Sequence, residues 1–96
     1  MTISEFSAST AAAEPPAGLS APLVALWYDA KGDWQRAHSL VDELETKDGM
    51  AVHAFLHRKE GADSNADYWY QRAGRDHFRP ALADEWHALV AHLLPR

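Results

Sequence analysis

Two histidines and a glutamate stand at helical spacing near the middle of the chain, in the segment His53-Ala-Phe-Leu-His57-Arg-Lys-Glu60. If this segment is helical, the three side chains fall within about 60° of arc on one helix face. Imidazole and carboxylate groups in such a cluster can bind a metal ion, transfer protons or hydrogen-bond to one another. This helix face is therefore the first candidate for a functional site.

Histidines at positions i and i+4 of a helix can offer two nitrogen ligands to one metal ion, and Glu60 could add an oxygen ligand. His38, on a preceding predicted helix, would have to complete the set. In zinc proteases of the H-E-x-x-H type a glutamate follows the first histidine, but here that place is Ala54, so the usual general base is missing. The sequence thus allows a divalent metal site made of His53, His57, Glu60 and His38.

A second polar and aromatic face follows on the next predicted helix, where Asn65, Tyr68, Trp69 and Arg72 share one side. If the two helices form an antiparallel pair, Arg72 comes near His53 and Glu60 comes near Asn65. An apolar pocket with a few convergent polar groups is the usual form of a small-ligand site. The predicted ligand-binding residues are His53, His57, Glu60, Asn65, Tyr68, Trp69 and Arg72.

Three interpretations of these residues remain open. The first is a non-catalytic binding or interaction module whose ligand is a protein, a peptide or a small molecule, with no catalytic residue and no cofactor assigned. The second is a small metal-dependent or acid–base enzyme centred on His53, His57 and Glu60. The third is a structural subunit with a satisfied buried polar network, which could form a homodimer through the apolar face of its first or last helix.

The pattern of apolar residues predicts an all-helical (all-α) domain of four to five helices. Asp33 is expected to cap the second helix, and Ser64 with Asp67 has the form of a capping box for the fourth. The predicted helices cover approximately residues 20–31, 34–44, 50–59, 65–73 and 80–93.

Two of the predicted turns have the same form, with a glycine followed five residues later by an alanine. These pairs are Gly32 with Ala37 and Gly61 with Ala66, related by a shift of 29 residues. Glycine permits a sharp turn, and alanine lets two helices approach closely. The sequence therefore predicts two antiparallel helical hairpins, covered by a C-terminal helix.

The segments 28–37 and 61–73 resemble the turn and second helix of tetratricopeptide-like repeats, including the Sel1-like variety. The resemblance covers about residues 22–75 and implies a concave groove that binds peptides or proteins. It departs from the family in having a shorter repeat and only two hairpins, where three or more repeats are usual. The strings 53–61 and 65–74 are also similar to short bacterial and fungal proteins, a likeness that implies no particular activity.

The amino-acid composition indicates which kinds of binding partner and which cellular compartment to expect. The net charge of −5 argues against binding nucleic acid or an anionic membrane through phosphate contacts. The chain has no cysteine, no apolar stretch long enough to span a membrane and no signal-peptide pattern, so we expect a cytoplasmic protein. Residues 1–18 are rich in small and polar residues and are expected to form a flexible arm, with residues 19–96 forming a single helical domain.

Overall fold

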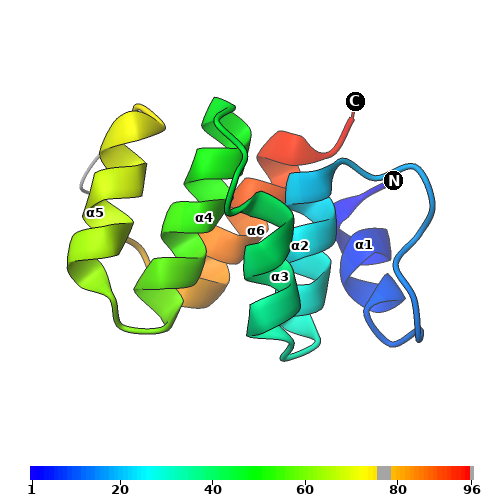
Figure 1. Cartoon of the computed structure of the whole chain (residues 1–96). Coiled ribbons are helices and arrows are strands. Elements are labelled where there is room, and N and C mark those ends of the chain that lie inside the picture. The colour runs from blue at the N-terminus through cyan, green and yellow to red at the C-terminus, as the bar shows by residue number, and fades with distance from the viewer. Residues whose placement is uncertain (76–78, 96) are drawn as a thin grey trace.

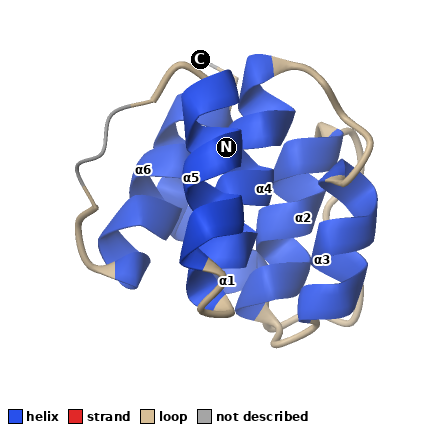
Figure 2. Ribbon diagram, turned by 60° about the vertical axis from the view of Figure 1, so that its left-hand side comes forward, coloured by secondary structure: helices blue, strands red, loops and turns tan. Residues whose placement is uncertain are grey.

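The protein is described by a computed structural model, in which residues 1–75 and 79–95 are placed well enough to describe. All the regular structure in these residues is helical (Figures 1 and 2). The described residues form six helices, α1 (Ile3–Ser9), α2 (Ala21–Ala30), α3 (Trp34–Val41), α4 (Lys47–Lys59), α5 (Asp63–Arg72) and α6 (Leu82–Leu93). The all-helical prediction is confirmed, but the predicted number of four to five helices is too low. Among the described helices, none has the length and hydropathy needed to cross a membrane.

The chain turns sharply after α2 and again after α4, at the two glycines that the sequence singles out. Gly32 has a φ of +85° and Gly61 a φ of +90°, in the left-handed region that favours glycine. The N–H of Gly32 donates to the carbonyl of Asp29 and that of Asp33 to the carbonyl of Tyr28, and equivalent bonds follow Gly61. These are Schellman-type helix ends. They bring α3 back against α2, and α5 back against α4 (Figure 1).

Small residues allow the paired helices to lie close together. Ala25, Ala37, Ala54 and Ala66 are all buried. The shift of 29 residues relates Ala25 in α2 to Ala54 in α4, and Ala37 in α3 to Ala66 in α5. The two alanines that follow the glycines are therefore packing positions, as the sequence predicts. Whether the hairpins stack as in tetratricopeptide repeats remains a prediction.

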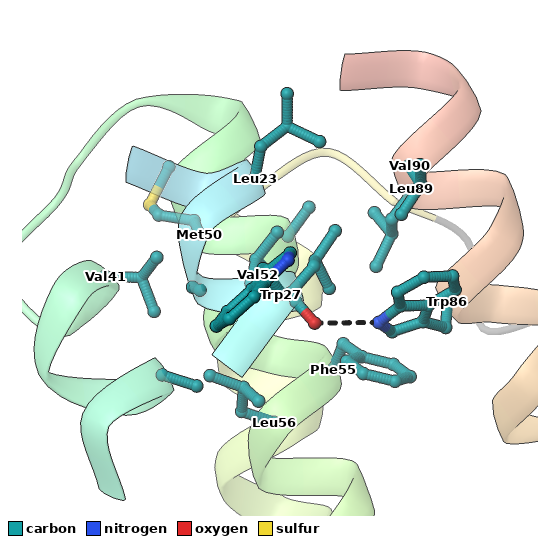
Figure 3. Close-up of a cluster of buried hydrophobic side chains, with 14 of the residues drawn as sticks. Leu23, Trp27, Val41, Met50, Val52, Phe55, Leu56, Trp86, Leu89 and Val90 are labelled. Carbon is teal, nitrogen blue, oxygen red and sulfur yellow. Dashed lines mark hydrogen bonds between the residues drawn. The ribbon is translucent and has the colours of Figure 1, made fainter. Parts of the chain in front are cut away.

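The core lies where α2 and α4 meet α6 (Figure 3). Trp27 from α2 and Phe55 and Leu56 from α4 are almost fully buried there. Trp86 from α6 packs beside them, and its indole N–H donates to the backbone carbonyl of Leu26 at 3.0 Å. This bond satisfies the polar atom of a large buried ring, so α6 covers the core as expected for the C-terminal helix.

The N-terminal segment differs from the flexible arm expected over residues 1–18, because it contains α1. Phe6 is fully buried and its ring lies 5.7 Å from that of Trp86, centroid to centroid. The hydroxyl of Ser9 accepts a hydrogen bond from the indole N–H of Trp27 at 3.1 Å. One aromatic side chain and one hydroxyl thus attach α1 to the core of the domain.

Several predicted helix ends are shifted. Asp33 caps α3 as predicted, but α3 ends at Val41, short of the predicted end at residue 44. Helix α4 begins earlier than predicted, since the Thr46 side chain accepts a hydrogen bond from the N–H of Gly49 and caps the helix there. The predicted capping box is wrong, because Ser64 lies inside α5 and makes no cap bond.

Candidate metal centre

Three histidine side chains from two helices converge between α3 and α4. His38 comes from α3, and His53 and His57 come from successive turns of α4. Each can offer one ring nitrogen to a group whose members all lie within 4.8 Å of one another. The Nε2 atoms of His38 and His53 are 3.1 Å apart, and the ring centroids of His53 and His57 are 4.7 Å apart. The spacing of His53 and His57 along the helix therefore does place both rings on one face.

His53 is the most deeply buried member of the histidine cluster, with 3% of its surface exposed. Burial lowers its pKa from 6.5 to about 4, with further lowering from His57 and His38 and a small opposing effect of Asp42. The ring is therefore neutral at pH 7. Its Nδ1 atom is buried and has no hydrogen-bond partner within the described part of the protein.

Glu60 does not belong to the group of possible metal ligands that the three histidines form. Its Oε2 atom lies 2.6 Å from Nδ1 of His57, so the carboxylate accepts a hydrogen bond from that ring nitrogen. This leaves Nε2 of His57 as the nitrogen available to a ligand. A carboxylate that holds the outer N–H of a histidine is the common partner of a metal-binding imidazole. Glu60 as a direct ligand stays a prediction; in the structure its carboxylate is hydrogen-bonded to His57.

Two tryptophans flank the histidine cluster. The ring of Trp34 stacks on His38 at 4.8 Å with an interplanar angle of 9°, and Trp69 from α5 stacks on His53 at 4.3 Å. Trp34 is held in place by a hydrogen bond of 2.8 Å from its indole N–H to the carbonyl of Leu56. Trp34 is not among the predicted site residues, although it stands four residues before His38 and so lies on the same face of α3.

The remaining predicted ligand residues lie farther toward the surface. Asn65 and Tyr68 line a shallow surface pocket at the turn between α4 and α5, together with residues 61–64. Tyr68 is 54% exposed. The guanidinium of Arg72 lies over the Trp69 ring at 5.1 Å and 3.9 Å from Glu45. Of the residues predicted on this helix face, Trp69 is the one that packs on a histidine of the cluster.

A second buried polar group, which the sequence analysis did not identify, joins α6 to α4 and α5. Glu85 accepts hydrogen bonds from Arg58 at 2.7 Å and from the hydroxyl of Tyr70 at 2.5 Å. Burial and the bond to Glu85 raise the pKa of Tyr70 well above its usual value, so the hydroxyl stays protonated and donates. Both carboxylate oxygens of Glu85 accept a hydrogen bond, one from Arg58 and one from Tyr70. Because these bonds join three helices, they indicate a structural role for Glu85.

A third polar contact links α2 to α4. Asp29 is 4% exposed, and its Oδ1 atom lies 2.9 Å from Nζ of Lys59. The two residues stand 30 positions apart in the sequence, so no local pattern could pair them.

Comparisons of the chain with protein-family models, with curated proteins and with solved structures find no match. The resemblance to tetratricopeptide-like repeats therefore remains a prediction from residues 22–75, and the histidine cluster has to be interpreted from its own geometry.

Proposed function

We propose that this domain binds one divalent transition-metal ion, of the zinc type, through His38, His53 and His57. The observation that carries the proposal is the convergence of three imidazoles from two helices, with their ligand atoms within 4.8 Å of one another. Imidazole nitrogen is a preferred ligand of zinc, copper and nickel ions. The proposal narrows the predicted binding module to one whose ligand is a metal ion.

The geometry of the cluster fits such an ion. Two nitrogens of a tetrahedral zinc site lie ~3.3 Å apart, given Zn–N bonds of about 2.0–2.1 Å. The 3.1 Å between the Nε2 atoms of His38 and His53 is close to this value. The ligand atom of His57 belongs to the same group, whose members lie within 4.8 Å of one another.

The protonation states of the cluster also favour a cation. A metal ion binds the neutral imidazole, and the lowered pKa of His53 keeps that ring neutral at pH 7. The hydrogen bond to Glu60 orients the His57 ring and places a negative charge next to it. A carboxylate in this position raises the basicity of the ligating nitrogen.

A bound ion would join the two hairpins of the domain. His38 belongs to the α2–α3 pair, whereas His53 and His57 belong to the α4–α5 pair, and residues 42–46 connect the two pairs. Because the ligands come together only in the folded chain, the ion would bind the folded state more tightly than the unfolded state. The domain should therefore be more stable with the metal than without it.

The test is calorimetric and thermal titration of the EDTA-treated protein, without a histidine tag, with zinc chloride at pH 7.5. We expect one zinc ion per chain. At a free zinc concentration 100 times the Kd, the stabilisation of about 2.7 kcal/mol should raise the Tm by roughly 10 °C or more.

Matched variants separate the cluster from other histidines. His38→Ala should abolish most of the zinc-induced rise in Tm, whereas His87→Ala should leave it unchanged because His87 is exposed on α6. His38 is only partly buried, so its replacement should leave a folded domain, which circular dichroism will verify. If zinc does not stabilise the wild-type protein, or stabilises His38→Ala equally, the proposal is wrong and the cluster is a structural polar network.

A further inference from the structure

The number of protein ligands in the histidine cluster indicates whether a bound metal ion would have a free coordination position. Zinc sites with a structural role are closed by four protein ligands, whereas sites that exchange ligands have three and a free position. In the described part of the chain, the group that could hold an ion contains the three histidines alone. The cluster therefore resembles an open site by ligand count.

Two carboxylates that act on the cluster, those of Glu60 and Asp42, do not belong to the group of possible ligands. Glu60 is hydrogen-bonded to the outer nitrogen of His57. Asp42 is the C-cap residue of α3, one turn after His38; it is exposed and lies outside the group of atoms within 4.8 Å of one another. Trp34 and Trp69 cover two sides of the cluster with ring surfaces, which offer no ligand atom.

The positive charge of a bound metal ion and the partial exposure of His38 both favour a ligand from the solvent. A divalent ion held by three neutral imidazoles keeps its full positive charge, which Glu60 offsets only in part from the far side of His57. His38 is partly exposed, so one side of the cluster lies close to solvent. Water could approach an ion held there from the side of His38, and a monovalent anion would offset part of its charge.

We infer that the metal ion of this site keeps one exchangeable coordination position, open to solvent beside His38, which takes water or a small monodentate anion. This inference rests on the proposed function and adds to it the class of ligand that the bound ion accepts. The site would then be a place for ligand exchange in addition to a link between the hairpins.

The experiment uses the full chain loaded with cobalt(II), whose visible absorption reports the ligands of the ion, and sodium azide as the anion. We expect azide to change the spectrum in a saturable way with one azide per cobalt. Asp42→Asn should bind cobalt within about threefold of the wild-type affinity, as should the neighbouring control Glu43→Gln. Removing the charge of Asp42 at the C-terminal end of α3 should not harm folding, since negative charge is unfavourable there.

The possible outcomes separate the inference from the proposed function. If wild-type protein binds cobalt but azide leaves the spectrum unchanged, the position is not exchangeable and the inference is overturned. If in addition Asp42→Asn weakens cobalt binding tenfold or more while Glu43→Gln does not, Asp42 is the fourth ligand and the site is closed. If no cobalt binds at all, the proposed function itself fails.

Discussion

His53 is a titratable side chain that folding removes from water, and this makes the stability of the metal-free domain depend on pH. Folding lowers its pKa from 6.5 to about 4, so between these values the unfolded chain binds more protons than the folded one. The stability associated with neutral His53 is fully present above pH 6.5 and is lost as the pH falls toward 4. Burial lowers this pKa most; the charges of His57 on α4 and His38 on α3 lower it further, and that of Asp42, the C-cap residue of α3, raises it.

Urea unfolding in EDTA at pH 7, 6 and 5 measures this effect. We expect the free energy of unfolding to fall with pH by at most about 1.4 kcal/mol per unit from this residue. His53→Gln should reduce the slope, whereas the exposed His87→Ala should retain it. An equal slope in His53→Gln and wild type would show that His53 is not the group responsible.

At the same scale, the predicted metal set includes all three histidines of the cluster, but the local sequence explains the proximity of only two of them. The positions of His53 and His57 follow from the helical repeat alone, so their proximity could be predicted. The contact of His38 with His53 spans 15 residues and depends on how α3 packs on α4. Glu60 is close to His57 as the spacing predicts, but the hydrogen bond of its carboxylate to Nδ1 of His57 depends on side-chain conformation.

At the scale of single elements, the short helix α1 is attached to the core by the buried Phe6 ring and by the Ser9 hydroxyl. Its first turn has a capping box, in which the Thr2 hydroxyl accepts from the N–H of Glu5 and the Glu5 carboxylate accepts from the N–H of Thr2. The Thr-x-x-Glu spacing is present in the sequence and would have predicted this start. The burial of Phe6 against Trp86 was not predictable, because the two residues are far apart in the chain.

Phe6→Ala should therefore destabilise the domain strongly. Removing a fully buried phenylalanine usually costs about 3–5 kcal/mol, through lost burial and the cavity left behind. Chemical denaturation of the variant measures this loss, with the exposed Ser4→Ala on the same helix as control. A loss below about 1 kcal/mol would mean that α1 contributes little and that residues 1–18 behave as the flexible arm that their composition suggests.

At the scale of the whole molecule, Glu85 links three helices. Its carboxylate on α6 binds Arg58 of α4 and Tyr70 of α5, and Arg58 also donates to the carbonyl of Pro80 at 2.6 Å. The Glu85 side chain is buried, so its ionised form is stable in the folded protein only with these partners.

Arg58→Met should leave the Glu85 carboxylate buried without its cation and cost about 3–5 kcal/mol of unfolding free energy. The double variant with Glu85→Gln should recover part of this loss, since it removes the unpaired charge. Arg75→Met, at an exposed position, serves as the matched control in the same urea titrations. If the double variant is no more stable than the single one, the unpaired charge is not the cause of the loss.

The sequence by itself determined the features that depend on residues within a turn or two of one another. These are the helical class, the turns at Gly32 and Gly61, the buried alanines that follow them, and the shared face of His53 and His57. Each follows from backbone geometry and the helical repeat, which are local properties.

Only the tertiary structure decided which residues from distant parts of the chain come into contact. Helix packing brings His38 against His53 and places Phe6 in the core, and side-chain conformation pairs Glu60 with Nδ1 of His57. Contacts between distant segments depend on how the helices pack and on which rotamers the packed interior allows, and a spacing pattern contains neither. The three converging histidines are therefore a product of the fold, built from one pair that the sequence specifies and one partner that packing supplies.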